Sequence, residues 1–234
     1  MGIDVIGVDG DDTLWHSEGH FHVTEQRFVE ILEPWVDADT VSTALVDTER
    51  NNLALFGYGV KGFTLSMIET ALTLSDHQVD ATRIERILSL GKELLAHPVE
   101  LLDGVAETLD VLRRDRRLVL ITKGDLFHQE SKVAASGVSE LFEGIEIVAE
   151  KDVATYERIM GRMETSPAGF CMVGNSVRSD IAPVLELGGA GVHVPYHVTW
   201  ALEHAEIADG HPRLARVAGI REAPAAIDAL AVGA

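Results

Sequence analysis

The hydrophobic positions along the chain follow two alternating patterns. Short runs of consecutive apolar residues, rich in β-branched side chains, are typical of strands buried on both faces of a parallel sheet. Such runs occupy residues 3–8, 118–122, 145–148, 169–173 and 191–194. Most of the segments between them carry apolar residues at helical spacing. The pattern therefore predicts an α/β fold with a three-layer α/β/α, Rossmann-like core and a mostly parallel sheet.

One long stretch shows helical periodicity alone. Its apolar positions form four successive helical segments, at residues 24–35, 41–56, 63–74 and 80–95. Four helices without an intervening strand indicate an inserted all-helical domain. We therefore assign residues 1–22 and 98–234 to the α/β core and residues 23–97 to the insertion. Gly19 disfavours a helix in residues 14–22, the stretch that precedes the insertion. We therefore expect this stretch to form a loop leading out of the core.

Composition narrows the class of protein. The 234 residues are 46% hydrophobic, which suits one α/β domain with an insertion and excludes a disordered chain. The formal net charge of −19 disfavours nucleic acid and anionic membranes as partners. The single cysteine, Cys171, cannot form an intrachain disulfide and fits a reducing cytoplasm. With no signal peptide or membrane span expected, we predict a cytoplasmic monomer or homodimer.

Acidic residues follow the first predicted strand directly. Asp9, Asp11 and Thr13 stand two residues apart, where the apolar run ends. Ligands of open α/β sheets bind at the carboxyl ends of the strands. An acidic cluster at that place must be solvated or neutralised by a cation. The stretch is therefore the first candidate for a functional site.

Three more polar groups follow the ends of later predicted strands. In chain order they are Thr122-Lys123-Gly124, then Lys151, and then Asn175 with Asp180. Together with Asp9-x-Asp11-x-Thr13, this order resembles the four motifs of the haloacid dehalogenase (HAD) superfamily. The insertion after the first motif is similar to the helical C1 cap of its phosphatases, and the resemblance covers nearly the whole chain. It implies a HAD-like core with an all-helical cap.

The resemblance implies a role for each motif residue in phosphoryl transfer. Asp9 would attack phosphorus and form an aspartyl-phosphate, and Asp11 would act as general acid and base. Thr122 and Lys151 would hold the phosphoryl oxygens. Lys123, one motif early, and Lys132, inside a predicted helix, are weaker candidates for the essential lysine.

The resemblance also implies a Mg²⁺ cofactor. Its expected ligands are Asp9, the main-chain carbonyl of Asp11, and either Asn175 or Asp180. Asn175 departs from the family pattern, in which an acid usually stands at that position. We favour an arrangement in which Asn175 ligates the metal while Asp180 holds a metal-bound water. In the alternative, Asp180 ligates directly.

The predicted function is that of a Mg²⁺-dependent phosphatase acting on a small phosphorylated metabolite. Asp11 favours ester hydrolysis over dehalogenation, because a halide leaves without a proton. A HAD-fold phosphomutase or dehalogenase and a catalytically silent HAD-fold binding protein are the alternatives. A phospho-acceptor signalling domain shares acidic strand ends, but it lacks the Asp-x-Asp-x-Thr motif and the insertion.

Candidate substrate contacts come from both parts of the chain. Thr13, Lys123 and Gly124 would contact the substrate from the core, with Gly124 allowing close backbone approach. Tyr58 and Lys61, in the stretch from Gly57 to Gly62, would reach its non-phosphate end from the cap. That stretch also matches G-x-G-x-x-G, but it follows a predicted helix, so a dinucleotide site lacks its context.

Histidines suggest a second kind of metal site. The spacing of three of them near the first motif suits zinc, and a histidine and a glutamate in the C-terminal tail suggest another ligand pair. Ordinary loop and tail packing is the favoured interpretation of both groups. The residues concerned are His16, His20, His22, His197 and Glu203.

Overall fold

The computed structural model describes residues 2–207 and 210–232. The chain divides into two compact units, Met1–His16 with Val99–Ala234, and Ser17–Pro98. In the part of the chain that the structure describes, no helix combines the length and the apolar character needed to cross a membrane.

The first unit is built on a parallel sheet, as expected, and the sheet has six strands, one more than the five apolar runs predicted. Its strands are β1 (Val5–Val8), β2 (Arg117–Lys123), β3 (Gly144–Val148), β4 (Phe170–Gly174), β5 (Ala190–His193) and β6 (Leu214–Arg216). Their order is β3-β2-β1-β4-β5-β6, and all of these neighbours pair in parallel. Val8 lies beside Leu120 of β2 and Val173 of β4, so three strands end at one edge next to the first motif.

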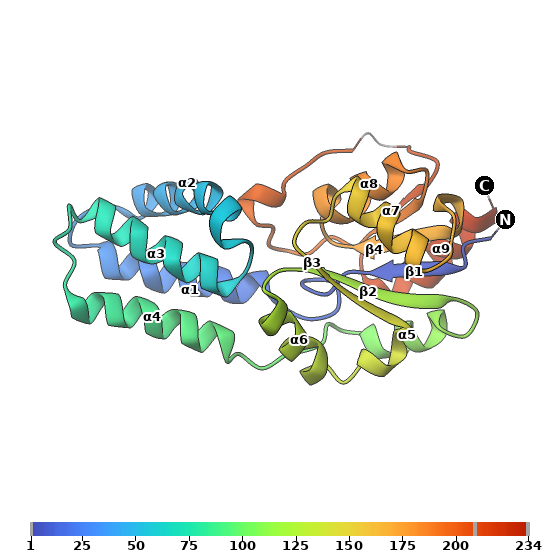
Figure 1. Ribbon diagram of the computed structural model, residues 1–234, viewed down its shortest axis with the longest axis horizontal. Coiled ribbons are helices and arrows are strands. Elements are labelled where there is room, and N and C mark those ends of the chain that lie inside the picture. The colour runs from blue at the N-terminus through green and yellow to red at the C-terminus, as the bar shows by residue number, and fades with distance from the viewer. Residues whose placement is uncertain (1, 208–209, 233–234) are drawn as a thin grey trace. The chain divides into compact units, whose positions relative to one another are not determined.

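Helices cover both faces of this sheet, which confirms the three-layer α/β/α prediction. They are α5 (Val105–Leu112), α6 (Leu126–Ala135), α7 (Val153–Arg162), α8 (Ala182–Glu186) and α9 (Ala223–Val232). Ile6 belongs to an apolar cluster with α5, α6 and α9, whereas its neighbour Val5 belongs to one with α7 and α8. Successive residues of a strand point to opposite faces, so β1 is buried on both sides. Figure 1 shows α5 and α6 on one side of the sheet and α7 and α8 on the other.

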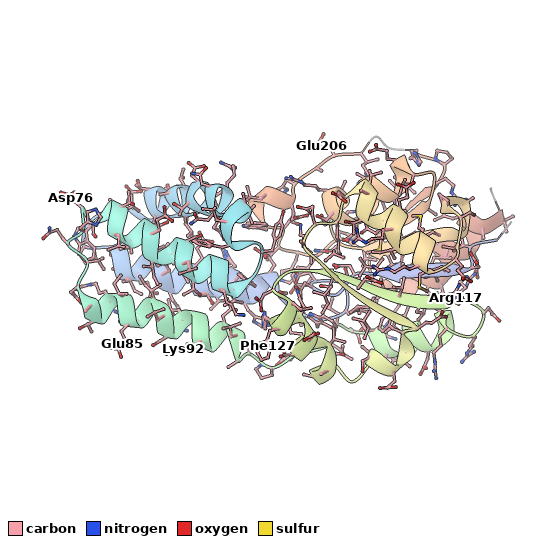
Figure 2. The ribbon with its side chains drawn as sticks, viewed as in Figure 1. Asp76, Glu85, Lys92, Arg117, Phe127 and Glu206 are labelled. Carbon is pink, nitrogen blue, oxygen red and sulfur yellow. The ribbon has the colours of Figure 1, made fainter. Side chains whose placement is uncertain are left out.

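Every regular element of the second unit is a helix. The four are α1 (Glu18–Leu32), α2 (Ala38–Phe56), α3 (Val60–Leu74) and α4 (Ala81–Leu95). Asp80 caps α4 by accepting a 3.0 Å hydrogen bond from the backbone N–H of Arg83. Ile87 on the inner face of α4 joins the buried cluster of this unit, while Glu85 and Lys92 lie on its exposed face (Figure 2).

The start of α1 corrects the sequence analysis. The helix begins at Glu18 rather than Thr24, so residues 17–22, which we assigned to a core loop, belong to the helical unit. Gly19 lies in the first turn, where backbone N–H groups have no intrahelical partner and its cost to the helix is small. Phe21 favours the helix because its ring packs on that of Phe63, with centroids 5.3 Å apart.

The C-terminal tail contains elements that the sequence did not reveal. Strand β6 has three residues, too few for a recognisable apolar run, and it forms because β5 offers a free edge. Helix α9 buries Ile227 and Leu230 against the sheet. Tertiary pairing, rather than local pattern, therefore creates the outer edge of the core.

A glycine in the helical unit allows α3 and α4 to pack closely. A Cβ at Gly91 would lie 2.2 Å from the hydroxyl of Thr64, which is buried and donates to the Val60 carbonyl at 2.7 Å. We expect Gly91→Ala to lower the free energy of unfolding by about 1–3 kcal/mol in urea titrations. Gly161→Ala on α7 is the control: its Cβ meets open space, so it should raise that free energy by about 0.5–1 kcal/mol. Equal shifts in the two variants would contradict the packing argument.

Candidate active site

The end of β1 positions Asp9. Its backbone N–H donates to the Val173 carbonyl of β4 at 2.9 Å, which continues the strand pairing by one residue. The Asp9 side chain is buried. One carboxylate oxygen, Oδ1, accepts from Nζ of Lys151, and the other, Oδ2, accepts from the Thr13 hydroxyl at 3.2 Å. A cation and a hydroxyl therefore fix this carboxylate from both of its oxygens.

Lys151 joins Asp9 to a second buried carboxylate. It lies between β3 and α7, and its Nζ also donates to Oδ1 of Asp180 at 2.6 Å. Asp180 stands in a π-helical turn, Val177–Ile181, directly after β4, and its Oδ2 accepts from the backbone N–H of Ser176 at 2.9 Å. Such turns often occur at functional sites. At Gly174 a Cβ would lie 2.3 Å from the same Oδ2, so only glycine leaves room for the carboxylate.

The charges of this trio do not balance. Two buried carboxylates face one ammonium, and the burial of Asp9 together with the charge of Asp180 raises the pKa of Asp9 to about 7. Burial lowers the pKa of Lys151, but the carboxylates of Asp180 and Asp9 outweigh it and raise that pKa above its ordinary value. Lys151 is therefore charged, and the trio has an excess of negative charge.

The donor set fits a hard divalent cation such as Mg²⁺. Carboxylate oxygens are its preferred protein ligands, and a cation would offset the excess charge on Asp9 and Asp180. Within residues 2–207 and 210–232, no three or more His, Cys, Asp or Glu side chains gather as a metal site. Main-chain or water oxygens would have to complete the coordination.

Asp11 lies in a separate polar environment. Its Oδ1 accepts from Nε1 of Trp15 at 2.6 Å and from Nζ of Lys132, and its Oδ2 accepts from Nε2 of Gln129 at 2.8 Å. Burial raises the pKa of Asp11, but Lys132 and the three hydrogen bonds together lower it below its ordinary value. Asp11 is thus held as an anion, and Lys132 pairs with it.

Thr122 presents a buried hydroxyl. It lies near the end of β2, and its Oγ1 has no hydrogen-bond partner among the described residues. A Cβ at Gly10 would come within 3.1 Å of that oxygen, so the hydroxyl lies beside the turn that carries Asp9 and Asp11. A buried hydroxyl normally has a partner, which makes Thr122 a candidate donor to a ligand.

Lys123 and Gly124 make contacts that the sequence did not suggest. Lys123 donates to Oε1 of Glu203 at 2.6 Å and to the Ser179 hydroxyl at 3.1 Å. The lysine that donates to Asp9 is Lys151. Gly124 has a φ of +143°, and a Cβ there would lie 2.9 Å from Nε2 of Gln129. Glycine at this position therefore makes room for a side chain of the protein itself.

Asn175 and Asp180 occupy different positions after β4. Asp180 shares the Lys151 ammonium with Asp9, as described above. Asn175 is half-buried, and its main-chain carbonyl pairs with Nε2 of His193 at 3.0 Å. The metal role of Asn175 stays a prediction.

The remaining candidates lie in the helical unit or pack against aromatic rings. Tyr58 stands between α2 and α3, and Lys61 in the first turn of α3, so the G-x-G-x-x-G stretch follows a helix rather than a strand. His16 pairs through Nδ1 with the Tyr196 hydroxyl at 2.7 Å. His20 stacks on His97 with ring centroids 3.6 Å apart. These contacts give the two histidines packing and hydrogen-bonding roles.

Sequence reasoning missed part of the site. It gave no role to Trp15 or Gln129, considered Lys132 only as a rival of Lys151, and left Glu203 in the tail. A usable signal existed for two of them: Gln129 and Lys132 are three residues apart, so they share one face of the helix that follows the second motif.

Comparison with known proteins gives a consistent family. A family model described as haloacid dehalogenase-like hydrolase matches residues 3–188. A haloacid dehalogenase-like family hydrolase from Xanthomonas campestris is 44% identical, with 99% of this chain and 93% of that chain covered and a TM-score of 0.90. No curated protein matched the chain.

Two more distant structures share the fold. A predicted phosphoglycolate phosphatase from Haemophilus somnus is 16% identical over 96% of this chain and 97% of its own, with a TM-score of 0.63. L-2-haloacid dehalogenase from Xanthobacter autotrophicus, solved with chloropropionic acid covalently bound, is 13% identical. The match covers 97% of this chain and 98% of that chain, with a TM-score of 0.66. The same architecture therefore occurs in proteins of both descriptions.

Proposed function

Because the chain belongs to the haloacid dehalogenase-like hydrolases, we propose that it is a Mg²⁺-dependent phosphatase of a small phosphorylated metabolite. One observation carries the proposal. The buried carboxylate of Asp9 is paired with Lys151, and a second carboxylate, Asp11, stands two residues further on with its own set of donors. A nucleophile and a separate acid/base group are what ester hydrolysis through a covalent intermediate requires.

In the first half of the reaction, a carboxylate oxygen of Asp9 attacks phosphorus and forms an aspartyl-phosphate. The leaving alkoxide departs on the opposite side and takes its proton from Asp11. Lys151 offsets negative charge next to Asp9, and the Thr122 hydroxyl donates to a phosphoryl oxygen. A bound phosphate dianion adds negative charge near Asp11, which favours its protonated form.

In the second half, Asp11 takes a proton from a water molecule that attacks the aspartyl-phosphate. Phosphate leaves, and Asp9 returns as a carboxylate. The three donors around Asp11 favour its ionised form, which is the form needed for this step. While Asp9 is esterified, Lys151 would stay next to Asp180 and offset the charge of the phosphoryl group.

Asp9 and Asp180, with the main-chain carbonyl of Asp11, are the residues that would hold Mg²⁺. The metal would supply positive charge that offsets the charge of the phosphoryl oxygens. The position of Asp180 beside Lys151 and Asp9 supports direct ligation by Asp180, in place of the arrangement with Asn175 that we favoured from the sequence. An amide oxygen of Asn175 would complete the set or hold a bound water.

We further propose that the helical unit, Ser17–Pro98, acts as a cap that selects the substrate. Tyr58 and Lys61 lie in and next to the turn between α2 and α3, and are the proposed contacts for the non-phosphate end. Thr13 and Lys123 are the proposed contacts from the core. A cap admits small substrates and excludes water during the transfer.

Dehalogenation is the second candidate reaction, since a dehalogenase shares the fold. A halide leaves without a proton and needs no acid at the position of Asp11. In this chain, three donors hold a carboxylate at that position, two residues after Asp9. This observation favours the phosphatase.

A paired assay separates the two reactions. We expect the wild type to hydrolyse p-nitrophenyl phosphate with Mg²⁺, EDTA to remove this activity, and Asp11→Asn to lower kcat by about 10²–10⁴-fold. We expect no chloride release from L-2-chloropropionate. Metal-independent chloride release, with p-nitrophenyl phosphate left intact, would identify a dehalogenase and overturn the proposal.

A further inference from the structure

We propose that Gln129 and Lys132, on one face of α6, are positioning residues that hold the Asp11 carboxylate in the orientation needed at the leaving group. The proposal rests on the proposed function, because it assigns a task to the acid/base group. The two side chains reach Asp11 across 118 and 121 residues of sequence. Neither touches Asp9 or Asp180 in the contacts described above.

Gln129 links the ends of two strands through one nitrogen. Its Nε2 donates one hydrogen bond to Oδ2 of Asp11 and another to the Lys123 carbonyl at the end of β2, both at 2.8 Å. An amide nitrogen carries two hydrogens, so both are used. The side chain is buried, and Gly124 leaves room for it, since a Cβ there would lie 2.9 Å from Nε2. Gln129 is thus fixed by the backbone of β2 and in turn fixes Asp11.

Lys132 and Trp15 hold the other oxygen. Nζ of Lys132 and Nε1 of Trp15 both donate to Oδ1 of Asp11. The indole is buried and fills the space left by Gly10, where a Cβ would lie 2.8 Å from its Cζ2 atom. The Trp15 carbonyl also accepts from the backbone N–H of Asp12 at 2.8 Å, so the ring and the acid belong to one rigid turn.

The two oxygens of Asp11 therefore have separate donors, and this fixes the plane of the carboxylate. The terminal torsion of an aspartate is otherwise broad, so the donors determine where a proton can be delivered. Without Gln129, Oδ2 loses its donor, and the carboxylate is less restricted in rotation about its Cβ–Cγ bond. A misplaced acid costs most when the leaving group depends most on protonation.

Matched substitutions on α6 test the role of Gln129. Gln129→Met removes the amide while keeping the length of the side chain, and Glu130→Met places the same residue at the exposed neighbouring position. The probes are phenyl phosphate and p-nitrophenyl phosphate, since phenol is the poorer leaving group. We expect Gln129→Met to lower kcat for phenyl phosphate about tenfold more than for p-nitrophenyl phosphate, and Glu130→Met to leave both unchanged.

Lys132 is tested by a conservative rescue. Lys132→Met should show the same selective loss on phenyl phosphate, and Lys132→Arg should restore most of it, because arginine keeps both the charge and a donor. KM for both esters should change less than kcat, since the donors act on Asp11 rather than on the phosphate. If Lys132 had a purely structural role, its substitution would lower kcat for the two esters by the same factor.

A second measurement does not depend on turnover. In ¹⁵N-labelled protein, the indole N–H of Trp15, identified with Trp15→Phe, should resonate downfield because it donates to a carboxylate at 2.6 Å. We expect this resonance to move in Gln129→Met and to stay unchanged in Glu130→Met. An unmoved resonance, or an equal loss on both esters, overturns the proposal. If the wild type hydrolyses neither ester, the proposed function fails, and the resonance alone decides whether Gln129 positions Asp11.

Discussion

Asp9→Asn is expected to abolish Mg²⁺-dependent hydrolysis of p-nitrophenyl phosphate, with kcat falling by about 10⁴-fold or more. The amide has the size of the carboxylate but cannot attack phosphorus, and it offers a cation one neutral oxygen instead of a charged group. The measurement is a steady-state assay at saturating Mg²⁺. Substrate should still protect the variant against thermal unfolding, because Thr122 and Lys151 remain.

The same variant should be more stable than the wild type at neutral pH in EDTA. The pKa of Asp9 in the folded chain is raised to about 7, so between roughly pH 4 and 7 the folded state holds a proton that the unfolded state has released. The stability of the metal-free wild type therefore falls as pH rises through this range, by on the order of 1 kcal/mol per pH unit at most. Asparagine does not titrate, so Asp9→Asn lacks this contribution to the loss of stability with rising pH.

Urea titrations of both proteins at pH 5 and pH 8 measure the difference. We expect the stability of Asp9→Asn relative to the wild type to be greater at pH 8, and Mg²⁺ to reduce this gain by stabilising the wild type. Equal relative stability at the two pH values would show that Asp9 is not an uncompensated carboxylate. Retained turnover in Asp9→Asn would remove Asp9 as the nucleophile.

Lys151→Met is expected to have the largest effect on stability. The substitution leaves Asp9 and Asp180 buried without their shared cation, and breaking a buried ion pair from one side costs about 3–5 kcal/mol. The loss should be smaller at pH 5, where Asp9 takes up a proton. It should also be smaller in Mg²⁺, because the metal replaces the missing positive charge.

Denaturant midpoints with EDTA and with Mg²⁺ measure this effect. Lys92→Met is the matched control, since Lys92 is exposed on α4 (Figure 2), and we expect it to change stability by less than about 0.5 kcal/mol. Turnover of Lys151→Met should fall by about 10²–10³-fold even where the variant is folded. A midpoint in EDTA equal to that of the wild type would contradict the electrostatic account of the trio.

Much of the site follows from the position of polar residues at the ends of predicted strands. Parallel strands bring their carboxyl ends to one edge, so the sequence predicts that the residues after β1, β3 and β4 lie near the same edge of the sheet. Asp9, Lys151 and Asp180 do so in the structure, within one set of buried hydrogen bonds. Their identity as nucleophile, charge partner and metal ligand is a proposal that the experiments above decide.

Local pattern was less informative where an element has no pattern of its own. The first turn of α1 contains Gly19, and its stability comes from contacts such as that of Phe21 with Phe63 in another helix. Strand β6 has three residues and exists because β5 needs a partner. In both cases tertiary packing outweighs intrinsic preference.

The sequence by itself determined the α/β core, the all-helical insertion and the edge of the sheet where polar residues gather, because hydrophobic period is a local property of the chain and parallel strands present their carboxyl ends at one edge. The tertiary structure decided which donors surround Asp11 and which carboxylate forms the close ion pair with Lys123. Gln129 and Lys132 share a helical face that many sequences show, and Glu203 lies 80 residues from Lys123. Only the register of α6 and the path of the tail over the sheet edge select these partners. Contacts across such distances depend on how whole elements pack, which no local pattern encodes.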